Sequence, residues 1–328
     1  MDISLITSLY QSDQFIQSYS GHVLRVARDV RDFGLSLEII IVANDASQYE
    51  RQVIEQLESH TNIVGIKSIY VDRETLYASW NRGIALATGT AIGFWNVDDI
   101  RTSDGIIAGY RHISEGHNLV LFAWIVHEIR SWFGLFTVIH KTPRPAESVT
   151  TQNAPESMKA GAFFMFTRPI FDIVGPFDER FLSGGDFDWY MRAAQKHTFF
   201  PCNELAGYFF YHGKGLSHNA LLQHAEDNVA FIKNGYEEYL KPTDPEFMRQ
   251  IWKKWQHDYT LTPELEDQLW GKITGQHWDS WQKQRNAKLA RRQRSDNLRM
   301  LPRLFIDKTG LRPLLARLGI VKGHRPVT

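Results

Sequence analysis

The sequence predicts an α/β fold with a Rossmann-like, mostly parallel sheet flanked by helices. Over the first hundred residues, short apolar runs of strand length alternate with segments whose apolar residues recur at helical spacing. The second run, residues 37–42, is almost continuously hydrophobic, as is typical of a strand covered on both faces. Strands that alternate with helices in this way form parallel sheets with right-handed crossovers.

The elements follow in order along the chain. The strands expected from these runs are residues 3–10, 37–42, 63–71 and 91–97, with helices around residues 23–30, 53–57 and 76–87 between them. Beyond residue 99 the alternation loosens. There we expect strands at 119–126, 161–167 and 208–211, helices around 106–113, 168–174 and 186–196, and a proline-containing loop at 141–155.

The composition is that of a folded globular protein, with 43% hydrophobic and 13% aromatic residues. The single cysteine, Cys202, excludes an internal disulfide framework and fits a reducing compartment. The first residues have no basic segment typical of a signal peptide, and the longest apolar stretch, residues 119–126, is too short to span a bilayer. A cytoplasmic location is therefore expected.

Polar side chains follow the fourth expected strand directly. Asp98 and Asp99 end the apolar run of residues 91–97, and a buried strand has no use for two adjacent acids. We therefore expect them just past its carboxyl end, where open α/β sheets bind ligands. Together with Asn96 they offer the oxygen ligands that Mg²⁺ or Mn²⁺ prefers. The alternative is a solvated turn.

A second acid, Asp45, follows the second expected strand and so lies at the same edge of the sheet. There it could hydrogen-bond a base or a ribose, although residues 44–47 could equally cap the next helix. A third acid, Asp186, begins a helix after two glycines. A carboxylate there is normally stabilised in its charged form, so it suits a general base only if burial or a nearby acid restores its basicity. The alternative is capping, with Asp188 and Arg192 as an i,i+4 pair.

A fourth stretch places His212 at the end of an aromatic strand, beside a loop that contains Lys214 and two glycines. An imidazole, a lysine and a glycine-rich backbone suit a diphosphate pocket. A lone histidine is nevertheless more often structural than a ligand.

In this order the stretches resemble the family 2 glycosyltransferases of the GT-A fold, over about residues 1–220. The matching segments are residues 8–11 at the end of strand one, 44–47 (D-D-G-S in the family), 79–84 (A-R-N-x-G), 96–99 (D-x-D-D), 174–179 (V-G-x-F-D-E), 185–188 (E-D-x-D) and 212–217 (a histidine with G-x-S).

This resemblance implies inverting transfer of a sugar from a nucleotide-sugar, with a UDP-sugar favoured, onto a glycan or lipid-linked acceptor in surface polysaccharide synthesis. Asp186 would take the proton from the acceptor hydroxyl. Asp98 and His212 would bind Mn²⁺ or Mg²⁺, and Asp45 would contact the nucleobase. The remaining donor contacts that the resemblance implies are Ser8, Tyr10, Arg82, Asn96, Asp98 and Lys214.

The chain departs from the family pattern at three positions, where Asn44, Asn96 and Gly185 stand in place of acids. The rival interpretation is a catalytically silent member that binds a sugar nucleotide or a glycan as a partner subunit. A nucleotidyltransferase is disfavoured because residues 8–20 contain no Gly, Lys or Arg to hold a triphosphate.

The sequence divides into a GT-A domain at 1–220, a helical extension at 221–282 and a basic amphipathic tail at 283–328. The tail holds 13 Lys and Arg against two acids, which leaves 24 basic and 35 acidic residues before it. Basic residues interleaved with leucines suit docking on an anionic membrane surface. A helix facing a partner or the body of the protein is the alternative, and we expect no nucleic acid partner.

Deleting residues 283–328 should release the protein from anionic lipid vesicles, because the deletion removes the basic cluster and its leucine face. Vesicle co-sedimentation measures this. Binding that is unchanged by the deletion would contradict the docking hypothesis.

Overall fold

Four parallel strands form the amino-terminal half of the sheet. The computed structural model describes residues 1–60, 63–132, 136–156, 163–211 and 219–263, together with residues 283 and 287. In it, β1 (Ile3–Leu9) lies between β2 (Leu37–Asn44) and β4 (Ala91–Phe94), and β3 (Gly65–Val71) pairs with β2. All four run in one direction, so their carboxyl ends share one edge, called the carboxyl edge below.

The second half of the sheet is mixed. Strand β8 (Phe164–Thr167) is antiparallel to β4 and to β6 (Leu119–Trp132), and β9 (Phe200–Tyr211) runs parallel to β6. The short β5 (Ile100–Arg101) adds to β9, and β7 (Phe136–Arg144) pairs with the distal part of β6. The resulting order is β3-β2-β1-β4-β8-β6-β9-β5.

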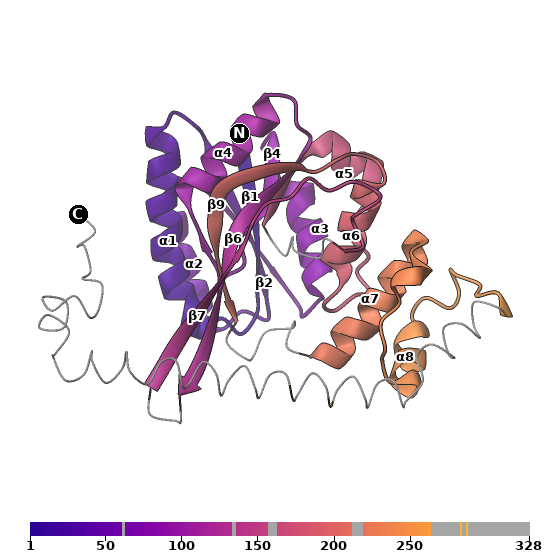
Figure 1. The fold of residues 1–328 in the computed structure, drawn as a ribbon. Helices are drawn as coiled ribbons and strands as arrows, with labels where there is room; N and C mark the ends of the chain where they lie inside the picture. Colours follow the sequence, from indigo (N-terminus) through magenta and orange to yellow (C-terminus); the bar gives the residue numbers. More distant parts are fainter. Residues whose placement is uncertain are drawn as a thin grey trace, which may run out of the picture.

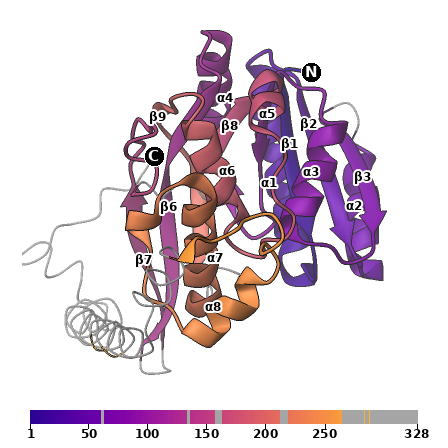
Figure 2. The same ribbon diagram turned by 90° about the vertical axis from the view of Figure 1, so that its right-hand side faces the viewer.

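Helices cover both faces of the sheet (Figure 1). One face packs against α1 (Asp13–Asp32), α2 (Gln48–Glu58) and α4 (Ser103–Ser114). The other packs against α3 (Leu76–Leu86), α5 (Arg168–Val174) and α6 (Gly185–Ala194). Figure 2 shows α7 (Ala220–Asn234) and α8 (Pro245–Trp252) on the same side as α6, and the 3₁₀ helix η2 (Glu237–Tyr239) links them.

A partly buried carboxylate, Asp178, joins these later helices to the sheet domain. It accepts hydrogen bonds from the Arg180 guanidinium at 2.8 Å, from Lys233 of α7 at 2.7 Å and from the Trp255 indole N–H at 2.9 Å. Burial by itself would raise the pKa of Asp178, but these donors hold it well below its usual range. The segment after residue 220 therefore packs on the sheet domain through a shared polar centre as well as a shared apolar core.

The α/β fold class expected from the sequence is confirmed, and the helix at 168–174 has the bounds predicted. The largest differences in strand length are at three strands. Strand β4 stops at Phe94, β6 continues to Trp132, and β9 begins at Phe200 rather than at residue 208. The loop expected at 141–155 was wrong in its first part, since residues 141–144 belong to β7. Pro143 is tolerated there because β7 pairs only with β6 among the described strands and so lies at a sheet edge. Among the described residues, no helix is both long and apolar enough to cross a bilayer.

Candidate functional site

The carboxyl edge brings together most of the polar residues singled out from the sequence. Ser8 is the last residue but one of β1, Asp45 directly follows β2, and Asn96 and Asp98 follow β4. The chain turns sharply after β4, because the Asp99 amide donates to the Asn96 carbonyl at 3.0 Å. The buried Trp95 holds this turn, since its indole N–H donates to the Asp99 carbonyl at 3.1 Å. His212 and Lys214 lie outside the described residues.

The turn after β4 concentrates oxygen atoms. Asp99 is buried, and one of its carboxylate oxygens accepts from the Asn96 amide at 3.1 Å. Its other oxygen, Oδ1, is buried without a hydrogen-bond partner in the part of the chain that the structure describes. Burial and the charge of the partly exposed Asp98 raise the pKa of Asp99 well above its usual range. Cations stabilise such a cluster, and its hard oxygen donors suit Mg²⁺ or Mn²⁺.

This arrangement explains why an amide, rather than an acid, stands at position 96. Its amide N–H₂ donates to Asp99, which an acid at the same position could do only while protonated. A third carboxylate would also add a like charge beside Asp98 and Asp99. Asn96 thus keeps one side-chain oxygen and removes one repulsion.

Asn44 is a structural residue, which the sequence did not reveal. Its buried side-chain N–H₂ donates to Ser79 Oγ at 3.0 Å and to the Leu9 carbonyl at 3.3 Å, and its oxygen accepts from the Glu74 amide at 3.0 Å. A carboxylate could not donate these bonds. Asn44 therefore ties β1 and β2 to the start of α3, and the departure from the family acid has a packing origin.

Asp45 is exposed at the carboxyl edge with a φ of +44°. This left-handed conformation is one that aspartate tolerates better than most residues, and the Asp45 amide donates to the Val71 carbonyl at 3.0 Å. The N-cap of α2 is Ser47, which forms a capping box with Glu50. The capping alternative therefore holds for Ser47 and leaves the Asp45 side chain available.

The other expected donor contacts lie around the start of α3. Arg82 forms a two-pronged ion pair with Glu74, with Nη2–Oε2 at 2.8 Å and Nε–Oε1 at 3.2 Å, and its side chain is half exposed. The Arg73 guanidinium lies over the Tyr10 ring at 4.5 Å, and Ser8 Oγ lies 3.5 Å from the Asn44 amide nitrogen. Glu74 was missed by the sequence analysis, and its charge now offsets that of Arg82.

Asp186 lies in the first turn of α6, close to the start of α3. Its Oδ1 accepts hydrogen bonds from the Tyr77 hydroxyl at 3.1 Å and from the Phe187 amide at 3.0 Å. Thr75, the N-cap of α3, donates to the Glu179 carbonyl at 2.9 Å, which joins the chain before α6 to the carboxyl edge. Burial raises the pKa of Asp186 to about 6, against the opposing effect of both hydrogen bonds. Its basicity is thus restored by burial, as a general base at a helix start requires.

Gly185 is required by the Tyr77 ring. A Cβ added at Gly185 would lie 2.6 Å from a carbon of that ring, closer than real contacts allow. The buried Tyr77 occupies the space that a side chain at position 185 would need, and its hydroxyl then reaches Asp186. The position of the Tyr77 ring therefore requires a glycine at position 185.

Glu226 of α7 fixes the loop that leads to Asp186. Its buried carboxylate accepts from three successive backbone amides, those of Leu182 at 2.9 Å, Ser183 at 2.7 Å and Gly184 at 2.9 Å. The sequence analysis missed it. The available signal was an acidic pair, Glu226 and Asp227, within a helical segment that is otherwise apolar around it.

Asp188 has a structural role. It is fully buried and forms ion pairs with Arg192 at 3.1 Å and with Lys233 at 3.0 Å. The i,i+4 pair expected between Asp188 and Arg192 is confirmed.

Comparison with known proteins identifies relatives of this fold. The model of the family described as Glycosyl transferase family 2 matches residues 5–174. Residues 1–349 of S. aureus TarS in complex with UDP-GlcNAc give a TM-score of 0.56 at 14% identity, covering 82% of this chain and 78% of that one. The mannosyltransferase PcManGT from Pyrobaculum calidifontis, in complex with GDP-Man and Mn²⁺, gives 0.52 at 14% identity, covering 77% and 69%. No match is found among curated protein sequences.

The hydrogen bond from Tyr77 should set the titration of Asp186. We expect the Asp186 carboxyl to titrate near pH 6 in the wild type and at higher pH in Tyr77→Phe, because the lost hydrogen bond lowers the pKa of Asp186. Carboxyl ¹³C NMR of aspartate-labelled protein measures both values. Tyr110→Phe is the matched control, since it removes a bond of the same kind to Asp2 at 3.0 Å. Asp186 titrating near 4 in the wild type would contradict this description of the site.

Proposed function

Because the chain belongs to glycosyl transferase family 2, we propose that it transfers a sugar, with inversion, from a nucleotide-sugar to an acceptor hydroxyl. The observation that carries this proposal is Asp186, a carboxyl group with a pKa near 6 that is held in a fixed orientation beside the carboxyl edge. A base with such a pKa is largely deprotonated at neutral pH yet more basic than an ordinary aspartate.

In the proposed reaction the acceptor oxygen attacks the anomeric carbon as Asp186 takes its proton. The bond between that carbon and the donor diphosphate breaks, and the nucleoside diphosphate leaves with the bonding electron pair. Attack from the face opposite the leaving group inverts the configuration. Loss of a positioned base typically slows such a step by ~10²–10⁴-fold.

The donor is proposed to lie along the carboxyl edge. The exposed carboxylate of Asp45 would contact the base, and Ser8, Tyr10, Arg82, Asn96 and Lys214 would supply further contacts. A UDP-sugar is our preferred donor, a preference supported by the TarS complexes with UDP-GlcNAc and UDP and weakened by the PcManGT complex with GDP-Man.

A divalent cation, Mn²⁺ or Mg²⁺, is proposed to be held by Asp98, with His212 as a further ligand. When bound, it would stabilise the negative charge on the leaving diphosphate. The adjacent carboxyl groups of Asp98 and Asp99, whose proximity helps to raise the pKa of Asp99, support a cation nearby.

For the acceptor we propose a glycan or a lipid-linked saccharide in surface polysaccharide synthesis, on the cytoplasmic side of a membrane. The basic tail at residues 283–328 would then dock on anionic lipid. This part of the proposal rests on sequence composition, because the tail falls outside the described residues apart from 283 and 287.

The proposal is tested by nucleoside diphosphate release from UDP-, GDP-, dTDP- and CMP-sugars, with and without Mn²⁺. We expect slow release from one donor class, strongly reduced by Asp98→Ala and by removal of the cation. Asp186→Asn should reduce this hydrolysis less than it reduces transfer to a true acceptor, because water replaces the acceptor in hydrolysis. Asp104→Asn, an exposed acid on α4, is the matched control and should change neither rate.

The rival function is a catalytically silent subunit that binds a sugar nucleotide or a glycan. No release from any donor, combined with thermal stabilisation by one nucleotide, would favour that function. If no donor released its nucleoside diphosphate and no nucleotide stabilised the protein, the proposed donor site itself would be contradicted.

A further inference from the structure

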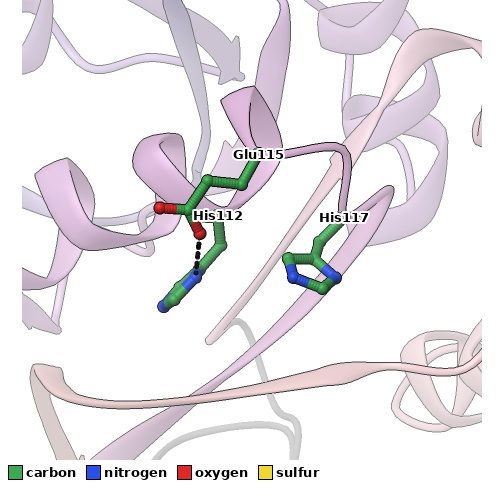
Figure 3. A group of neighbouring side chains, drawn as sticks. All are labelled: His112, Glu115 and His117. Atoms are coloured by element: carbon green, nitrogen blue, oxygen red, sulfur yellow. Dashed lines mark hydrogen bonds and ion pairs between the residues drawn. The ribbon is translucent and has the colours of Figure 1, made fainter.

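We propose a second metal site, for a borderline transition metal such as Zn²⁺, formed by His112, Glu115 and His117 (Figure 3). One ligand atom from each residue lies within 4.8 Å of the other two. The site is independent of the proposed glycosyl transfer. It lies just before the first residue of β6. Leu119, at that end of β6, pairs with Phe166 of β8, which in turn pairs with Ile92 near the start of β4. The site is therefore at the sheet edge opposite the carboxyl edge.

The local fold brings the two histidines together. Helix α4 ends in a Schellman motif, in which the Gly116 amide donates to the Ile113 carbonyl at 3.1 Å and the His117 amide donates to the His112 carbonyl at 3.0 Å. Gly116 has a φ of +99°, the left-handed conformation that this motif needs. The motif commonly places an apolar pair at the positions of residues 112 and 117, whereas here both are imidazoles.

A phenylalanine fixes both rings. The Phe200 ring, at the start of β9, stacks on His117 at 3.7 Å between ring centroids and packs against His112 at 4.7 Å. Packing of this kind limits the rotamers of metal-binding imidazoles before the metal arrives. The His112–His117 centroid distance is 6.0 Å.

Glu115 completes the set. Its carboxylate lies 3.1 Å from His112 Nδ1, and its side chain is 61% exposed, so it can rotate. Ligand atoms around a tetrahedral Zn²⁺ at ~2.0–2.1 Å are about 3.3 Å apart. The three ligand atoms, which lie within 4.8 Å of one another, must therefore draw together on binding, and the exposed Glu115 side chain can follow the metal. The ion pair between His112 and Glu115 explains why these two side chains lie together. It does not explain why a ligand atom of His117 also lies within 4.8 Å of both.

The ligand chemistry selects the metal. Two imidazoles with one carboxylate suit Zn²⁺, Co²⁺, Ni²⁺ or Cu²⁺, whereas Mg²⁺ and Mn²⁺ prefer sites made of oxygen. A bound ion would link the end of α4 to the beginning of β6, and through Phe200 to β9. Its expected effect is therefore on stability, with no direct effect on the carboxyl edge.

Isothermal titration of Zn²⁺ into the tag-free, chelator-treated full chain tests the site. We expect one tight site in the wild type, weakened at least about tenfold by His112→Ala or His117→Ala, and weakened less by Glu115→Gln. His257→Ala, an exposed histidine elsewhere, and Asp98→Ala, at the carboxyl edge, should leave this site unchanged. A rise in melting temperature on adding Zn²⁺ should be lost in both histidine variants.

A wild type that binds no Zn²⁺, or histidine variants that bind it as the wild type does, would overturn the proposal. Should a histidine variant fail to fold, the wild type alone still decides through Co²⁺. A strong visible absorption typical of a tetrahedral complex would support the site, and its absence would contradict it.

Discussion

The candidate site depends on one interaction, the acceptance of three successive backbone amides by the Glu226 carboxylate. Residues 182–184 lead into α6 and would otherwise leave buried and partly buried amides without partners at a helix start. Unmade hydrogen bonds of buried groups cost about 1–3 kcal/mol each, so the loop and α7 are strongly coupled. The proposed division at residue 220 marks a change in sequence pattern, while the core and this interaction run across it.

The two edges of the sheet carry different chemistry for a reason that lies in the topology. Strands β1, β2 and β4 end together, so their following residues supply carboxylate, amide and hydroxyl oxygens to one place. The opposite edge receives the end of α4, whose chain reversal supplies imidazoles instead. Hard cations are expected at the first edge and borderline metals at the second.

The sequence predicted the strands that end at the carboxyl edge, because continuous apolar runs followed by acids are visible without any contact information. It could not predict the roles of Asn44, Asn96 and Gly185, since each depends on a partner far away in the chain or on a buried neighbour. The Asn44 side chain hydrogen-bonds Ser79 and the Glu74 amide, and the Asn96 amide donates to the buried Asp99. Gly185 leaves room for the Tyr77 ring. Departures from a family pattern that suggested a silent protein thus have local packing explanations.

The most direct test of this account is the effect of Glu226→Gln on sugar transfer and on nucleotide binding. The variant keeps the shape of the side chain but must turn its N–H₂ toward at least one of the three backbone donors, so the loop before Asp186 should be held less firmly. We expect at least a tenfold fall in the transfer rate, on the order expected for a misplaced base, with unchanged nucleotide affinity. Glu238→Gln, exposed on η2, should have no effect. An unchanged transfer rate in a folded Glu226→Gln protein would contradict the account.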